Sequence, residues 1–290
     1  MRYFVARGET DRLGPDTRAG RRGDFAVLSD GTTHYELAGP ASGPVFVFVP
    51  GLTIPLDFWD EVTTVLHGRG SRTLTYSAYG RGYSDRVRGR YGRPLFVRQL
   101  DDLIRRLGLS DVHVVGSSMG ALISLAYAAS PGSRAASLTV SGPAGLSAER
   151  NPIALLPDPL TPLVGKHLLR RNLLAHLDRN VESTVDAERL RTVVLDGFRF
   201  EGSMHALTST LTHVPFTNQD ALFDAAGLPP TMLVWGANDR VTPATAFDRA
   251  VELLKPVRAE HIPDCGHMAP FERPQRFADL LTTFVTELQT

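Results

Sequence analysis

Cysteine and long apolar runs are scarce in this 290-residue sequence. Cys265 is the only cysteine, so the chain cannot form an internal disulfide, and a reducing compartment is expected. No apolar run approaches the roughly 20 residues that a membrane-spanning helix requires. The first 24 residues are rich in arginine, glycine and acids and contain no apolar segment of a signal peptide. These absences predict a cytoplasmic protein without a membrane span.

An excess of charge of one sign is also missing. The 31 Lys and Arg residues balance 31 Asp and Glu residues, and no basic stripe interleaved with aromatic residues stands out. Neither a nucleic acid nor an anionic membrane is therefore predicted as a partner. No group of His, Asp and Glu has the spacing of metal ligands, so no metal and no organic cofactor is predicted. A small-molecule substrate is expected, and the oligomeric state remains open.

The strongest motif present is Gly-Ser-Ser-Met-Gly at residues 116–120. An apolar run at 111–115 precedes it and a helical pattern follows it. On a strand-to-helix turn, G-x-S-x-G strains the backbone of the central serine and raises its hydroxyl above the edge of the sheet. The motif therefore predicts Ser118 as a nucleophile, with Ser117 pointing away from the site. Serine is a weak nucleophile by itself, so a histidine base and an orienting carboxylate are required.

Two later loops contain candidates for the acid and the base. Asp239 follows the apolar run 231–235, and His267 lies on a loop before the amphipathic C-terminal helix. Asp264 and Asp220 are alternatives for the acid, but Asp264 is too near His267 in sequence to be placed independently of it. The neighbouring Cys265 is interpreted as a small packing residue.

The chain order Ser118, Asp239, His267 selects one scaffold among known carriers of such a triad, because chymotrypsin-like and subtilisin-like enzymes use other orders. The sequence resembles α/β-hydrolase-fold serine hydrolases of the carboxylesterase and lipase kind, including monoacylglycerol-lipase-like members. Residues 45–52 resemble the strand and oxyanion loop of that family, and residues 79–85 resemble its G-x-G-x-S-D turn. The resemblance extends from about Phe25 to the C-terminus.

The resemblance also implies an oxyanion hole. In this fold the donors are the backbone N–H groups of the residue after the nucleophile and of the early oxyanion loop, which here are Met119 and Leu52. Pro50 stands where the family commonly has histidine. In the turn at 79–85, Arg81 and Asp85 are interpreted as parts of the turn rather than as a clamp for a charged substrate.

The order of apolar patterns predicts an α/β fold: a mostly parallel sheet flanked by helices, with an inserted helical cap. Residues 1–24 are predicted to form a flexible or peripheral arm, residues 25–143 and 224–290 the core, and residues 144–223 the cap. The cap begins with a proline-rich stretch at 151–162 and continues with leucines at helical spacing. Met204 and Leu207 within it are interpreted either as lining of an acyl pocket or as core.

The expected function is hydrolysis of a carboxylic ester with an apolar acyl or alcohol part, through an acyl-enzyme. Lactonases, thioesterases, carbon–carbon bond hydrolases and perhydrolases use a matching triad, so these reactions stay open. A hypothesis of another class is a ligand receptor that retains the triad but turns over slowly.

Overall fold

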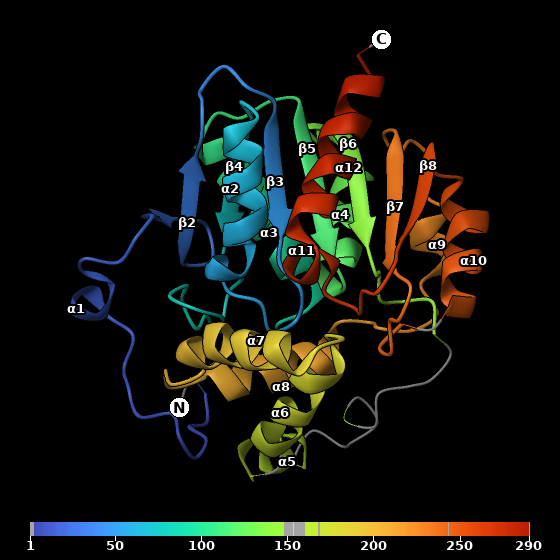
Figure 1. Ribbon diagram of the computed structural model, residues 1–290. Helices are drawn as coiled ribbons and strands as arrows, with labels where there is room; N and C mark the ends of the chain where they lie inside the picture. The colour runs from blue at the N-terminus through green and yellow to red at the C-terminus, as the bar shows by residue number, and fades with distance from the viewer. Residues whose placement is uncertain (1–2, 148–152, 154–159, 168, 243, 290) are drawn as a thin grey trace.

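The computed structural model describes residues 3–147, 153, 160–167, 169–242 and 244–289. Within these residues eight strands form one sheet in the order β1-β2-β4-β3-β5-β6-β7-β8 (Figure 1). The strands are β1 (Asp24–Val27), β2 (Thr32–Ala38), β3 (Val45–Val49), β4 (Arg72–Tyr76), β5 (Val112–Ser117), β6 (Ala135–Ser141), β7 (Thr231–Gly236) and β8 (Arg258–Ile262).

The sheet is parallel from β4 to β8, and only β2 runs antiparallel to its neighbours β1 and β4. The chain moves from β3 to β4 on one side and later places β5 on the other side of β3. The direction of winding therefore reverses between β3 and β5. At such a reversal the loops at the carboxyl ends of the strands diverge and leave a crevice in which open α/β sheets bind ligands.

Helices cover both faces of this sheet (Figure 1). The helices of the core are η1 (Leu56–Trp59), α2 (Asp60–Gly68), α3 (Arg93–Arg106), α4 (Met119–Ala128), α9 (Asp220–Phe223), α10 (Ala244–Leu254), α11 (Ala269–Glu272) and α12 (Pro274–Glu287). Helix α2 packs beside α12, whereas α3 packs beside α4 on the other face. The predicted mostly parallel sheet flanked by helices is confirmed.

The side chains of the central strands alternate between two apolar clusters, one on each face of the sheet. In β3, Phe46 and Phe48 belong to the apolar cluster that includes α2 and α12, whereas Val47 and Val49 belong to the cluster with α3 and α4. Successive side chains of a strand point to opposite faces, so a strand that is apolar at every position is buried on both sides.

The helices inserted between β6 and β7 lie across the carboxyl ends of the strands (Figure 1). They are α5 (Thr161–His167), α6 (Leu169–Arg179), α7 (Thr184–Gly197) and α8 (Ser203–His213), and we call them the cap helices. The leucines at helical spacing fall on α5 and α6, as predicted, on either side of residue 168, which lies outside the described residues. Most of the proline-rich stretch at 151–162 lies outside the described residues. None of the described helices is both long and apolar enough to cross a membrane.

The N-terminal arm, whose helix α1 spans Pro15–Arg18, lies against the cap helices and the core. Glu9 is 6% exposed, and its carboxylate accepts hydrogen bonds from the backbone N–H groups of Ala6, Gly202 and Met204. Farther along the arm, Arg18 forms an ion pair with Asp85. The beginning of α8 is therefore held by a carboxylate of the N-terminal arm, 193 positions earlier in the sequence.

Candidate active site

Ser118 occupies the sharp turn between β5 and α4, as the motif predicts. Its backbone angles are φ 55° and ψ −115°, a strained conformation for a residue with a side chain. The flanking glycines make room for this turn, because a Cβ atom on Gly116 would lie 2.5 Å from the Gly120 carbonyl oxygen. A Cβ atom on Gly120 would lie 2.1 Å from the carbonyl oxygen of Val49 at the end of β3. The first turn of α4 thus sits directly against the neighbouring strand.

Asp239 and His267 form a hydrogen-bonded pair at the carboxyl ends of β7 and β8. The imidazole Nδ1–H donates to Asp239 Oδ2 at 2.7 Å, and both side chains are 1% exposed. Thr242 Oγ1 donates to the same oxygen at 2.5 Å, and the N–H groups of Val241 and Thr242 donate to Oδ1. Four donors fix the carboxylate, and the proton on Nδ1 leaves the Nε2 lone pair as the basic atom of the ring.

The same hydrogen bonds keep Asp239 ionised. Burial raises the pKa of this carboxyl group, but the His267 ring and the donors from Thr242 outweigh burial, so the pKa lies below its ordinary value. An anion at this position holds the imidazole in one tautomer and stabilises it when it becomes protonated.

Two groups that the sequence analysis did not identify hold the His267 loop. The Asn180 carbonyl oxygen, at the end of α6, accepts the N–H groups of His267 at 2.9 Å and Met268 at 3.1 Å. The Glu272 carboxylate accepts the N–H groups of Gly266 and Met268. The only sequence signal for Glu272 is its place in the Glu-Arg-Pro segment before α12. A backbone carbonyl such as that of Asn180 has no residue signature.

The link between nucleophile and base is open in this structure. Among the described residues, the buried Nε2 atom of His267 has no hydrogen-bond partner. The Ser118 side chain instead lines a cavity beneath the cap helices.

Both predicted oxyanion-hole residues lie next to Ser118. Met119 is fully buried as the first residue of α4. Leu52 follows β3 and lines the cavity that contains Ser118. A Cβ atom on Gly51 would lie 3.6 Å from Ser118 Cβ, so the oxyanion loop passes close to the nucleophile. Because β3 and β5 are hydrogen-bonded neighbours, their loops meet at the reversal point of the sheet.

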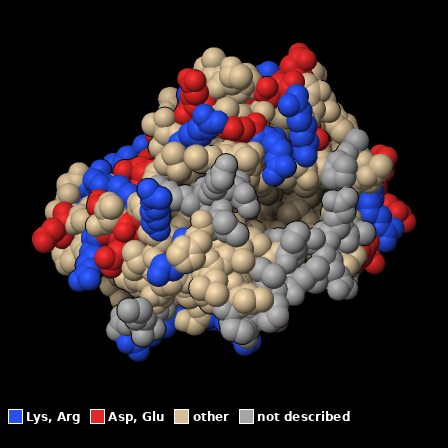
Figure 2. Space-filling view, turned by 90° about the horizontal axis from the view of Figure 1, so that it is seen from below, with Lys and Arg blue, Asp and Glu red and all other residues tan. Residues whose placement is uncertain are grey.

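Two neighbouring hollows adjoin this site. The first, of about 280 Å³, contains Ser118, and the second, of about 570 Å³, lies between the cap helices α6 and α8. Leu52, His176 and Leu211 line both hollows, so the two lie side by side, and we call them the smaller and the larger chamber. Leu207 lines the larger chamber, whereas the fully buried Met204 lines neither. The face that carries the cap is visibly hollowed, with acidic and basic residues intermixed around it (Figure 2).

His176 is the titratable side chain that the cap adds to both chambers. Burial, followed by the nearby His267 ring, lowers the pKa of His176 to about 4. At neutral pH it is therefore an uncharged hydrogen-bonding group. The larger chamber is otherwise lined mainly by aliphatic side chains, together with Thr53 and Arg179. The position of His176 on α6, one turn before Asn180, could not be recognised from sequence because the cap resembles many amphipathic helices.

The alternative residues lie outside this arrangement. Asp264 is exposed, and Asp220 forms an ion pair with Arg249. Ser117 is fully buried and points away from the chambers. Cys265 is also buried, and burial raises the pKa of its thiol, which keeps it protonated and unreactive.

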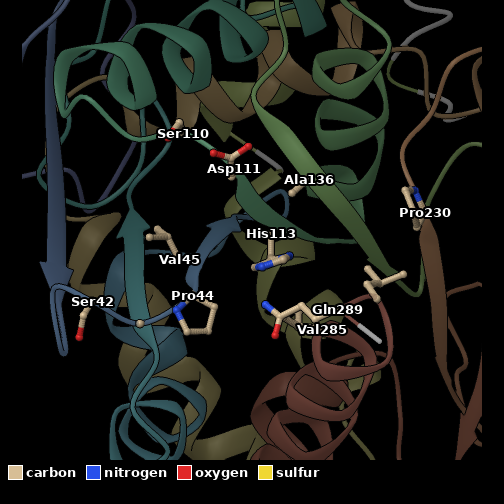
Figure 3. A pocket seen from close by; sticks show the side chains of 12 residues that line it. Ser42, Pro44, Val45, Ser110, Asp111, His113, Ala136, Pro230, Val285 and Gln289 are labelled. Atoms are coloured by element: carbon tan, nitrogen blue, oxygen red, sulfur yellow. The ribbon is translucent and has the colours of Figure 1, made fainter.

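A separate hollow of about 560 Å³ lies at the opposite end of the sheet. Figure 3 shows Asp111 and His113 in its wall, beside Pro44 and Gln289. His113 Nδ1 is 2.9 Å from the hydroxyl oxygen of Ser137 on the adjacent strand, so this ring nitrogen has a hydrogen-bond partner within the sheet. In the described part of the chain, no three His, Cys, Asp or Glu side chains gather in a way that would hold a metal ion.

Comparison with known proteins agrees with this geometry. Residues 46–280 match the model of the family described as "Alpha/beta hydrolase family". The chain belongs to the alpha/beta hydrolase family. The matched range includes the Ser118 turn, the Asp239 loop, the His267 loop and all four cap helices.

Relatives within the family carry different activities in their names. A monoacylglycerol lipase of Xenopus laevis is 24% identical over 222 residues, which cover 67% of this chain and 61% of the lipase. The 2-hydroxy-6-oxo-6-(2'-aminophenyl)hexa-2,4-dienoic acid hydrolase of Metapseudomonas resinovorans is 23% identical over 246 residues, 79% of this chain and 78% of that enzyme.

A solved structure is similar over nearly the whole fold. An esterase from Thermogutta terrifontis superimposes with a TM-score of 0.78 at 17% identity, covering 92% of this chain and 100% of the esterase. At that identity the likeness establishes the alpha/beta hydrolase fold and leaves the substrate undetermined.

Proposed function

We propose that this alpha/beta hydrolase cleaves a carboxylic ester with an apolar acyl or alcohol part, using Ser118, His267 and Asp239 as a catalytic triad. The observation that carries the proposal is the buried Asp239–His267 pair beside a strained serine that opens into a cavity. A neutral imidazole held by an ionised carboxylate is the base that a serine hydroxyl requires.

The reaction follows from the roles of these groups. Ser118 Oγ attacks the ester carbonyl carbon while His267 Nε2 accepts the hydroxyl proton, and the carbonyl oxygen becomes an oxyanion. The N–H groups of Leu52 and Met119 are the proposed donors to that oxyanion. Collapse expels the alcohol, which takes the proton from His267, and leaves an acyl ester on Ser118. Water then attacks the acyl ester while His267 accepts a proton from it. The proton passes to Ser118 Oγ as the carboxylic acid leaves.

The chambers support an apolar substrate. Leu169, Leu173, Leu207 and Leu211 line the larger one, and its volume of about 570 Å³ is within the range of small-molecule sites. The smaller chamber contains the nucleophile. We infer that the scissile carbonyl lies in the smaller chamber and that the apolar chain extends past Leu211 into the larger one.

Fluorophosphonate labelling with peptide mapping tests the activated serine before a substrate is chosen. The expected result is a single phosphonylated peptide that contains Ser118, absent in Ser118→Ala. A panel of p-nitrophenyl esters of increasing chain length then tests the reaction. If no ester is hydrolysed faster than by Ser118→Ala, the esterase proposal is wrong.

Cleavage of a carbon–carbon bond is the second candidate, because the relative from Metapseudomonas resinovorans, named as a hydrolase of a 2-hydroxy-6-oxo-dienoic acid, matches over most of both chains. Such a substrate also presents a carbonyl to the nucleophile but must have a carbon leaving group protonated. Turnover of a 2-hydroxy-6-oxo-dienoate at a higher kcat/KM than the best ester would favour this reaction. Multiple turnovers of either compound would contradict a slow ligand receptor.

A further inference from the structure

Arg81 is a buried cation that none of the catalytic steps above uses. The residue is 1% exposed, and no carboxylate in the described part of the chain lies within ion-pair distance of its guanidinium group. Burial lowers the pKa of Arg81 to about 9, so the group is still charged at neutral pH. An unpaired buried charge is costly, so its retention calls for an explanation in terms of what it binds.

The guanidinium group joins the oxyanion loop to the cap. Arg81 Nε donates to the Leu52 carbonyl oxygen at 2.7 Å, and Nη2 donates to Thr210 Oγ1 on α8 at 3.0 Å. The Thr210 hydroxyl in turn donates to the carbonyl oxygen of Ala206, one turn earlier, at 2.7 Å. The hydroxyl is therefore oriented with its lone pair toward Arg81.

The turn that carries Arg81 is built to fit beneath α8. Gly80 has φ 81°, and a Cβ atom on it would lie 2.3 Å from Ala206 Cβ. Gly82 has φ 46°, and a Cβ atom there would meet Ser77 Oγ at 2.6 Å. Two glycines in left-handed conformations let the turn pass between core and cap, and Arg81 is the side chain of this turn that binds both the oxyanion loop and α8.

The Leu52 carbonyl group that Arg81 binds belongs to the same residue as the proposed oxyanion donor, the Leu52 N–H group. The Leu52 carbonyl oxygen is three covalent bonds from the Leu52 N–H group. Because peptide groups are planar, holding this carbonyl fixes the peptide plane that follows Leu52 and thereby restricts the rotation of its backbone. A guanidinium donor also gives a stronger hydrogen bond than a neutral one.

We propose that Arg81 is a positioning residue that holds the oxyanion loop with the Leu52 N–H group aimed at the substrate, and that Thr210 couples this loop to α8. The same helix carries Leu207 and Leu211, which line the larger chamber. A shift of α8 around a bound acyl chain thereby moves the oxyanion loop as well. The inference rests on the proposed function, because it assumes an oxyanion next to Ser118.

Arg86 provides a matched control in the same turn. Arg86 is half-buried, and its guanidinium group donates to the carbonyl oxygens of Gly82, Ser84 and Gly197 and to the Ser203 hydroxyl. Arg86 thus links the turn to the cap but does not contact the oxyanion loop. Loss of either arginine removes a cation that links the turn to the cap, whereas only loss of Arg81 frees Leu52.

The experiment compares Arg81→Met, Arg81→Lys, Arg86→Met and Thr210→Val, each checked for folding by circular dichroism and thermal unfolding. Ester kinetics and the affinity for an alkyl trifluoromethyl ketone, which forms an oxyanion on serine, are measured for every variant. We expect Arg81→Met to lower kcat about 10- to 100-fold with little change in KM, because small displacements of catalytic groups have effects of this size. The ketone should bind more weakly by a similar factor. Arg81→Lys should recover part of the loss, and Arg86→Met should stay within about 3-fold of the unmodified chain.

The inference is overturned if Arg81→Met and Arg86→Met change kcat and ketone affinity equally. If Arg81→Met does not fold, Thr210→Val decides, because it removes one partner only. A fall in kcat of about 3-fold or more with unchanged KM supports the coupling, and an unchanged kcat contradicts it. Failure of the unmodified chain to react with fluorophosphonate at Ser118 would instead contradict the proposed function, whatever the Arg81 variants do.

Discussion

The core loops and the cap contribute different kinds of groups to the site. The core supplies the side chains of the proposed triad, Ser118 after β5 and the Asp239–His267 pair after β7 and β8. The cap supplies groups that hold these loops, namely the Asn180 carbonyl oxygen under the His267 loop and the Thr210 hydroxyl beside Arg81. The cap is therefore a support for the catalytic loops as well as a cover for the chambers.

This difference sets the expected sizes of substitution effects. Removing a core group that reacts should abolish a chemical step, whereas changing the cap should alter which substrates fit or how well the loops are held.

The largest effect is expected at the nucleophile and the base. Ser118→Ala and His267→Ala should each lower kcat for ester hydrolysis by at least about four orders of magnitude. The double variant should be no slower than either single variant, since the residues act as one unit. Steady-state kinetics on a p-nitrophenyl ester measures this, and additive losses would show that the two residues do not act together.

The acid is expected to contribute less than the nucleophile or the base. Asp239→Asn should reduce kcat by about three to four orders of magnitude, because an amide stabilises neither the correct tautomer nor the protonated ring. The exposed Asp264 in the neighbouring loop gives the control, and Asp264→Asn should change kcat by less than about 3-fold. A silent Asp239→Asn together with a crippling Asp264→Asn would mean that the acid is misassigned.

The pKa of Asp239 also predicts a pH dependence of stability. The pKa is lowered in the folded chain, so its ionisation stabilises the fold above the ordinary carboxyl pKa of about 4. That contribution is lost as the pH falls through the lower folded value. The difference in melting temperature between the unmodified chain and Asp239→Asn should be constant near neutral pH and shrink below about pH 4. A difference that grows toward acid would contradict the assigned direction.

The site residues that could be predicted from the sequence lie in the core, whereas the contacts that could not be predicted involve the cap. Ser118 and Asp239 each follow an apolar strand, and His267 lies on a Gly-His loop before an amphipathic helix, so their placement at one edge of a parallel sheet could be predicted. The hydrogen bond from Arg81 to Thr210 joins residues 129 positions apart, and that from Gly202 to Glu9 joins residues 193 apart. Such contacts depend on how the cap is seated, which no local pattern specifies.

A moderate effect is expected where the cap lines the larger chamber. Leu207→Trp should raise KM about 10-fold or more for long-chain esters while acetate esters and fluorophosphonate labelling stay nearly unchanged, since the indole fills part of the larger chamber that a long chain would occupy. Leu163, an exposed leucine of α5, is the control, and Leu163→Trp should affect neither ester. Equal losses for all chain lengths would assign Leu207 to the core. Met204, which lies behind the lining, should show such uniform losses when enlarged.

The smallest effect on activity is expected at the junction of the arm and the cap. Glu9→Ala leaves the buried N–H groups of Ala6, Gly202 and Met204 without their acceptor, which should lower the free energy of unfolding by about 1 to 3 kcal/mol. Denaturant unfolding measures this loss, and kcat should change by less than about 3-fold because Glu9 contacts neither chamber. Glu201→Ala, which removes only the exposed ion pair with Arg12, should cost less than about 1 kcal/mol. A fall in kcat for Glu9→Ala comparable to that of Arg81→Met would contradict this distinction between core and cap. It would mean that the position of α8, which Glu9 holds from the arm, affects catalysis as strongly as the contact between Arg81 and the oxyanion loop.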